Sequence, residues 1–167
     1  MNKVLKKVLL GLVCSFALMG QAFGDALSDA NRVYDTGDYE KAAKLYLPLA
    51  KNGTAEAQYT LGMMYRAGRG VEHDYTEARK WYTLAAEQGH TMAQFYLGWI
   101  YAGGKGVPKD LVQSHMWVDL ALASATGEAK KEIMVDRDAI EKVMTADQIA
   151  KARELAKKCT ANKFKGC

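Results

Sequence analysis

The sequence contains little that indicates catalysis or a bound metal. It has three cysteines, two prolines and three histidines in 167 residues. The histidines are His73, His90 and His115, and none stands at the i, i+4 spacing with which a helix presents a pair of metal ligands. We therefore expect neither a metal nor another cofactor.

Motifs for nucleophilic and nucleotide chemistry are also missing. Beyond residue 24 the serines are Ser28, Ser114 and Ser124, and none is followed three residues later by the lysine of a Ser-x-x-Lys hydrolase. The paired glycines at 68–70 and 104–106 lack the Lys-Ser/Thr of a phosphate-binding loop. Asp136, Arg137, Asp138 and Glu141 form a charged run, which we interpret as a solvated helix face. These absences predict that the protein is not an enzyme.

The first 24 residues have the layout of an export signal. Three lysines precede an uncharged, mostly apolar run at 8–24, which ends in Ala-Phe-Gly, a small-residue cleavage site. The run is slightly short for a membrane span, which needs about 20 residues. We expect cleavage after residue 24, with no membrane span left in the mature chain. The alternatives are a membrane anchor and a lipid attached to Cys14.

The net positive charge belongs largely to that segment. The whole chain has 23 Lys and Arg against 19 Asp and Glu. Because three of the lysines and no acidic residue lie in 1–24, the charges of the remaining chain balance to within one. We therefore expect no nucleic-acid partner. The remaining chain is long enough for one domain with a modest core.

Cys159 and Cys167 are the only cysteines beyond residue 24. An even number of cysteines in an exported chain predicts a disulfide, which here would close a short loop in the tail 159–167. The alternatives are two free thiols or a weak metal pair, although no histidine stands nearby to complete a zinc site.

A repeat of 36 residues organises the rest of the chain. When the sequence is shifted by 36 positions, many residues coincide without gaps, which is typical of stacked-repeat proteins. The coincident pairs include Gly62 with Gly98, Tyr65 with Tyr101, Gly68 with Gly104, Asp74 with Asp110, and Trp81 with Trp117.

Each unit is predicted to be a pair of helices. The apolar residues of 55–67 have helical spacing, and Gly68 ends that helix. A second helix begins near Asp74, a good N-cap followed by Glu77 in a capping-box pattern that Asp110 and its neighbours repeat. An earlier second helix covers 38–51, where Pro48 is expected to kink or fray the last turn.

Gly62 lies inside a predicted helix, where glycine costs about 1 kcal/mol relative to alanine. Its recurrence as Gly98 indicates two helices that approach too closely for a side chain. By the same register Trp81 and Trp117 are predicted core positions, as are Tyr65, Tyr82 and Tyr101.

The repeated residues carry a family resemblance. From 57 to 89 the chain reads AQxxLGxxYxxGxGVxxDxxxAxxWYxxAAxxG, and the copy at 93–125 matches closely but has Val118 and Leu122 where the pattern has Tyr and Ala. This pattern resembles the Sel-one-like repeat of the tetratricopeptide superfamily. The resemblance implies an all-α fold, an α-solenoid of stacked antiparallel helix pairs with a C-terminal capping helix. We expect a solenoid at 25–158, made of a partial unit at 25–53, full repeats at about 54–89 and 90–125, and a divergent unit with its cap at 126–158.

The positions that the repeat leaves free predict a binding surface. In tetratricopeptide-type solenoids the first helix of each unit lines a concave groove, so aromatic and Met side chains at free positions would form an apolar strip there. The alternative is that Phe95 and Trp99 simply pack against the neighbouring unit. The predicted partner-binding residues are Tyr59, Met63, Arg66, Phe95 and Trp99, with Lys131 at the margin.

The resemblance implies an exported adaptor or scaffold that binds another protein or a peptide on its concave face, in the bacterial periplasm or outside the cell. One alternative is a cell-envelope hydrolase of the penicillin-binding or β-lactamase type, as some exported relatives are described. Those relatives carry a cysteine pair in every repeat, which this chain lacks. A second alternative is a structural subunit of an envelope complex.

Overall fold

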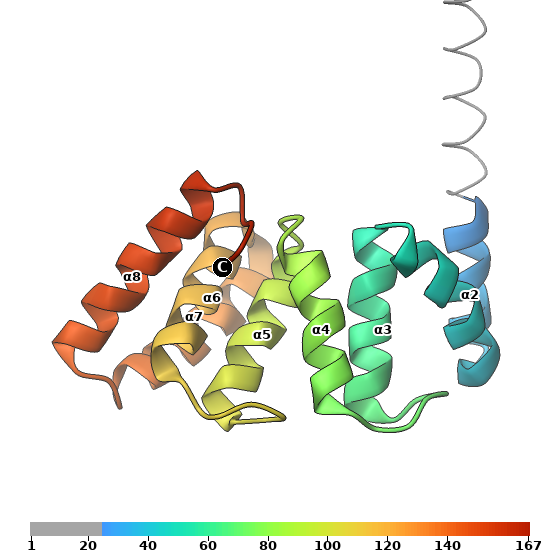
Figure 1. The fold of residues 1–167 in the computed structure, drawn as a ribbon, viewed down its shortest axis with the longest axis horizontal. Helices are drawn as coiled ribbons and strands as arrows, with labels where there is room; N and C mark the ends of the chain where they lie inside the picture. Colours follow the sequence, from blue (N-terminus) through green and yellow to red (C-terminus); the bar gives the residue numbers. More distant parts are fainter. Residues whose placement is uncertain (1–24) are drawn as a thin grey trace, which may run out of the picture.

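The computed structural model describes residues 25–167, and the regular structure in this part of the chain is helical (Figure 1). The predicted export signal and Cys14 lie outside the described residues. Within them no helix is both long and apolar enough to cross a bilayer. A helical segment at 25–35 precedes α2 (Tyr39–Lys51), α3 (Ala55–Ala67), α4 (Tyr75–Ala86), α5 (Thr91–Gly103), α6 (Leu111–Ser124), α7 (Gly127–Glu141) and α8 (Ala146–Ala161).

The helices stack in sequence order along the long axis of the molecule (Figure 1). The closest partners are α3 with α4 and α5 with α6, and α2, α4 and α6 each also pack against the next helix. The predicted all-α solenoid of helix pairs is confirmed. Pro48 does not end α2, which continues to Lys51.

Aspartates begin the second helices as N-caps. The Asp74 carboxylate accepts from the backbone N–H groups of Thr76 and Glu77, and Asp110 accepts from that of Gln113. The other half of the predicted capping box is wrong, because the cap's own N–H is already used. The N–H of Asp74 donates to the carbonyl of Tyr65 at 3.0 Å, and in the next repeat the N–H of Asp110 makes the same bond, also at 3.0 Å, to the residue equivalent to Tyr65. These bonds tie each glycine loop back to its first helix.

The two helices of each pair approach closely at Gly62 and at Gly98. A Cβ placed on Gly62 would lie 2.6 Å from ring carbons of Tyr82. A Cβ on Gly98 would lie 2.5 Å from Cγ2 of Val118 and 3.0 Å from the carbonyl oxygen of Ser114. Carbon atoms normally approach to about 3.5–4.0 Å. The two helices of each pair can therefore pack this closely only because the residue at this position has no side chain.

The core of the solenoid is a series of small clusters between successive helices. Trp81, Tyr82 and Trp117 are buried in them. Tyr65 and Tyr101 are only half-buried and pack at the edges of the clusters, so their prediction as core residues is wrong. Both follow the helical glycine by three residues, near the end of the first helix, where the solenoid surface begins.

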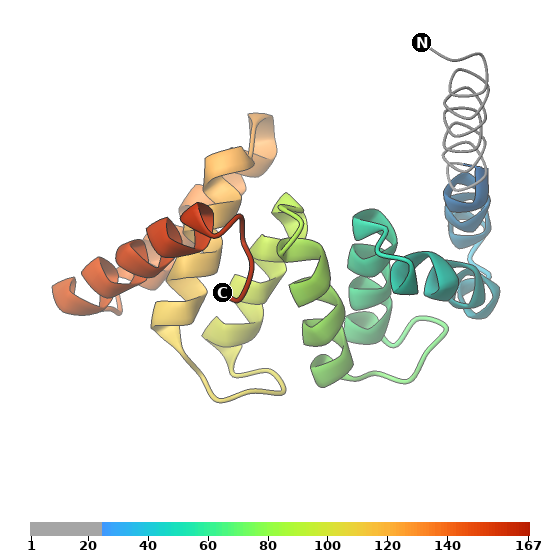
Figure 2. The same ribbon diagram turned by 45° about the horizontal axis from the view of Figure 1, so that its top comes forward.

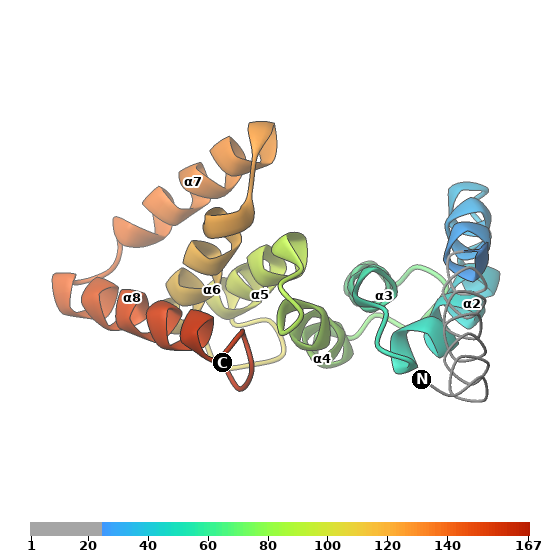
Figure 3. The same ribbon diagram turned by 90° about the horizontal axis from the view of Figure 1, so that it is seen from above.

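The C-terminal end departs from the repeat. Met134 stands where the earlier units have glycine, and α8 packs on α6 instead of pairing along α7. Figure 3 shows α7 and α8 diverging from their connection. Of the residues in α7, only Ile133 is fully buried.

The chain then folds back on itself. Cys159 and Cys167 form a disulfide, and the tail turns toward the middle of the solenoid (Figures 1 and 2). There the N–H of Gly166 donates to the Glu87 carboxylate at 3.3 Å, and the Phe164 ring packs beside Gly89.

Candidate functional site

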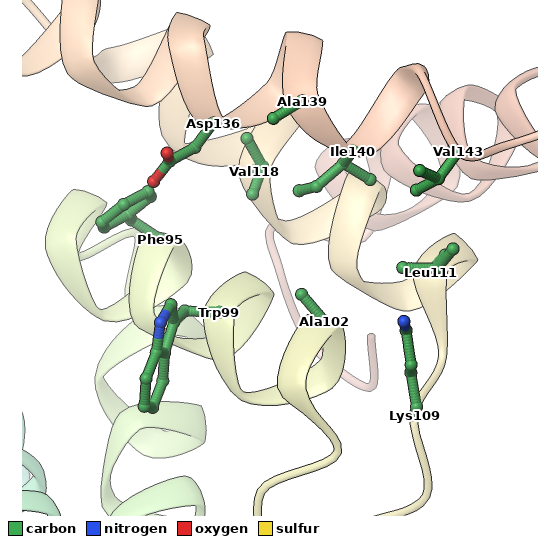
Figure 4. A pocket seen from close by; sticks show the side chains of 10 residues that line it. All are labelled: Phe95, Trp99, Ala102, Lys109, Leu111, Val118, Asp136, Ala139, Ile140 and Val143. Carbon is green, nitrogen blue, oxygen red and sulfur yellow. The ribbon is translucent and has the colours of Figure 1, made fainter.

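An apolar pocket of about 300 Å³ lies between α5, α6 and α7 (Figure 4). Its volume is roughly twice that of the ~150 Å³ cavity that holds one benzene ring, so it can receive about two large apolar side chains. The lining consists of Phe95, Trp99 and Ala102 from α5, Lys109 from the loop before α6, Leu111 and Val118 from α6, Asp136, Ala139 and Ile140 from α7, and Val143 just after it.

Helical spacing places the two aromatic residues of α5 on the same wall. Phe95 and Trp99 are one turn apart and both face the pocket (Figure 4). Trp99 is 37% exposed, unusual for tryptophan, which is highly buried on average. Phe95 is half-buried and also packs against the buried cluster around Val118 and Ile133, as the alternative expected, whereas Trp99 stays exposed.

The pocket carries one charge at each end. Figure 4 shows Asp136 beside Phe95 at one end and Lys109 beside Leu111 at the other. Both residues are exposed, and neither has an ion-pair partner among residues 25–167. Both charged side chains are therefore available to interact with a ligand in the pocket.

The predicted binding strip is divided by the structure. Phe95 and Trp99 line the pocket, and Arg66 lies over the Trp99 ring at 5.8 Å from its centroid. Tyr59 instead stacks on His90, with ring centroids 4.5 Å apart, and burial raises the pKa of its hydroxyl. Tyr59 and Met63 are half-buried and pack against the core between α4 and α5, so neither faces the pocket.

The α7 wall was missed by reasoning from the repeat. Ala139, Ile140 and Val143 come from the divergent unit, where few residues of the repeat pattern remain. Their signal was present in the sequence as apolar residues at helical spacing, since Val135, Ala139 and Val143 stand at i, i+4 and i+8.

A buried histidine on α6 links the α7 wall of the pocket to α6. His115 on α6 is 0% exposed, and its Nε2 lies 2.7 Å from Oε1 of Glu141 at the end of α7. The Nδ1 atom lies 3.3 Å from Oδ2 of Asp119. Arg153 of α8 donates to the same Glu141 oxygen at 2.9 Å, and Arg137 lies 4.0 Å from it. Glu141 therefore links three helices, and the interpretation of it as part of a solvated face is wrong.

Charge in this cluster favours a protonated histidine. Burial lowers the pKa of His115, but the nearby Asp119 and Glu141 carboxylates outweigh it and raise the pKa above its usual value. The hydrogen bond from His115, and to a lesser extent that from Arg153, lowers the pKa of the Glu141 carboxyl. The resulting ion pair holds the C-terminal end of α7 on α6.

Within residues 25–167 no three His, Cys, Asp or Glu side chains are arranged to hold a metal. Of the serines considered as nucleophiles, Ser114 is buried in α6, and Ser124 shares a 2.7 Å hydrogen bond with Thr91.

Fold and sequence together define a helical repeat protein. The Sel1 repeat model matches residues 34–54, 55–90 and 91–124, more than half of the chain. The chain therefore belongs to the Sel1 repeat family, whose members typically mediate protein–protein interaction. A comparison with curated protein sequences finds no match.

Two solved structures support this assignment. The crystal structure of c5321, a protective antigen present in uropathogenic Escherichia coli strains that displays an SLR fold, aligns with a TM-score of 0.74 and 32% identity over 84% of this chain. A Sel1 repeat protein from Oxalobacter formigenes aligns with a TM-score of 0.59 and 32% identity over 65% of this chain. The chain spans only 32% and 44% of these two proteins.

Proposed function

We propose that this protein is an interaction module that binds a segment of another protein at the pocket between α5 and α7. The observation that carries the proposal is Trp99, an exposed tryptophan on the wall of an apolar pocket. Aromatic residues at apolar depressions are typical anchors of protein interfaces, where truncating one costs about 2 kcal/mol or more. The family supports the general role, while the binding face and the partner are our proposal.

We further propose that the protein acts outside the cytoplasm, in the bacterial periplasm or as a secreted protein. The disulfide between Cys159 and Cys167 supports this location, because disulfides persist in oxidising compartments. The apolar layout of residues 1–24 supports it independently.

The test compares two exposed apolar side chains of similar exposure. Leu84 on α4 is 39% exposed and lies outside the pocket, so Leu84→Ala is the control for Trp99→Ala. Each variant is used to capture partners by cross-linking in the envelope of the producing bacterium. We expect Trp99→Ala to reduce the partner's affinity at least tenfold and Leu84→Ala to leave it unchanged. Equal capture by all three proteins would place the site elsewhere, and a permanent stoichiometric complex would support a structural subunit instead.

A further inference from the structure

The pocket offers almost no hydrogen-bonding groups to a ligand. Of its lining side chains, only Lys109, Asp136 and the Trp99 indole have polar atoms. Apart from Lys109 and Val143, the lining residues belong to helices, so most of the surrounding N–H and C=O groups are already paired. An extended peptide would leave its own backbone groups unpaired on such a surface, which is costly. A helix pairs these groups internally and presents only side chains.

The apolar face of α7 extends beyond the pocket. Val135 and Val143 are both 67% exposed; Val135 and Ala139 lie one turn apart on α7, and Val143 follows directly after the helix ends. Ala139 and Val143 also line the pocket, so these apolar residues and the pocket form one continuous surface. In the regular units the first helix packs along a second helix, whereas α8 has moved onto α6. From residue 136 to 143 the surface is about 10 Å long, or two helical turns.

The unpaired charges give this surface a direction. The N-terminus of a helix carries a partial positive charge and its C-terminus a partial negative charge. A helix lying in the pocket would therefore be favoured with its N-terminus at Asp136 and its C-terminus at Lys109, the opposite ends shown in Figure 4.

We infer that the partner segment is an amphipathic α-helix, which lies parallel to α7 with its N-terminus near Asp136 and inserts apolar side chains between α5 and α7. The inference rests on the proposed function and adds the conformation and the direction of the bound segment. Side chains spaced i, i+3 or i+4, and i+7 on one helix would fill a surface two turns long.

The test uses a synthetic probe with a defined direction. The probe is a C-terminally amidated 14-residue peptide of Ala and Gln with Leu at positions 4, 8 and 11, whose N-terminal amine is acylated with a nitroxide label in place of an acetyl group. Binding to the oxidised chain is followed by nuclear magnetic resonance, in which the nitroxide broadens nearby backbone amides. We expect broadening at Asp136 and Phe95 and little at Lys109 or Leu111. Trp99→Ala should lower the affinity for the peptide at least tenfold.

Exchanging the two charges supplies the matched control. The double variant Asp136→Lys/Lys109→Asp keeps the net charge and changes two exposed side chains. We expect it to bind the same peptide in the reversed direction, so that the broadening moves to the Lys109→Asp end. Broadening that stays at one end in both proteins, or appears equally at both ends, would overturn the inferred direction.

Further outcomes separate this inference from the proposed function. A peptide with proline at positions 6 and 9 cannot form the helix, so binding as tight as that of the parent would overturn the helical conformation. If the parent peptide does not bind at millimolar concentration, the inferred helical conformation is overturned as well. In either case the proposed function stands if Trp99→Ala still loses the native partner. If the protein self-associates and Trp99→Ala abolishes this self-association, the occupant of the pocket would be a second copy of this chain and the inferred partner helix would be wrong.

Discussion

Replacing Gly98 with alanine tests whether close helix approach stabilises the repeat. The new Cβ would lie 2.5 Å from Cγ2 of Val118, about 1 Å inside normal contact, and 3.0 Å from a backbone oxygen that cannot rotate away. Overpacking of this kind costs about 1–3 kcal/mol. Alanine also gains about 1 kcal/mol over glycine in helix propensity. Because the propensity gain offsets part of the overlap, we expect Gly98→Ala to lower the free energy of unfolding by up to about 2 kcal/mol.

The control lies on the same helix. A Cβ on Gly103 would meet only the flexible side chain of Lys105, so Gly103→Ala retains the propensity gain without a rigid overlap. We expect it to be neutral or to stabilise the protein by up to about 1 kcal/mol. Denaturant unfolding measures both variants, and in a domain of this size each kcal/mol shifts Tm by about 2–4 °C.

A second substitution identifies the cause. Val118→Ala removes the methyl group that the new Cβ would strike, so Gly98→Ala should cost less in the Val118→Ala background than alone, with a coupling of about 1 kcal/mol or more. The close approach of the two helices would be refuted if Gly98→Ala had the same free energy of unfolding as the wild type. It would also be refuted if the losses of stability from Gly98→Ala and Val118→Ala were additive in the double variant.

Trp117→Ala, in the core, should cost about 3–5 kcal/mol of stability, while Trp99→Ala should lower Tm little; equal losses would make Trp99 a core residue. Because the pKa of His115 is raised in the folded protein, its charge contributes stability that is fully present below the usual pKa of 6.5 and is lost as pH rises through the folded-state pKa. His115→Gln should therefore make the free energy of unfolding depend less on pH above pH 6.5. An unchanged pH dependence would contradict the ion pair with Glu141. Reduction should add two hydrogens to the mass and cost at most about 2–3 kcal/mol, whereas free thiols in the exported protein would contradict the disulfide. Intact-mass measurement should find the exported chain beginning near residue 25, and mostly full-length chain in the cytosol would refute export.

The repeat could be predicted in detail because its features are local. Helical spacing, aspartate N-caps and glycine loop ends depend on residues a few positions apart, and the 36-residue register aligns one unit with the next. The same register marked Gly98 as a point of close approach before its neighbour was known. The failed half of the capping box depended on a longer contact, the bond from Asp74 to Tyr65 across the loop.

The C-terminal third depended on tertiary structure. Met134 removes the small residue that lets two helices of a unit pack closely, but the sequence does not show where the displaced helix goes. Its position on α6 leaves apolar residues of α7 exposed. The packing of α7 on α6 places the buried His115 against Glu141, 26 residues away. Such long-range contacts leave no periodic trace in the sequence, so Phe95 and Trp99 could be predicted from the repeat, whereas the packing of α7 opposite them could not.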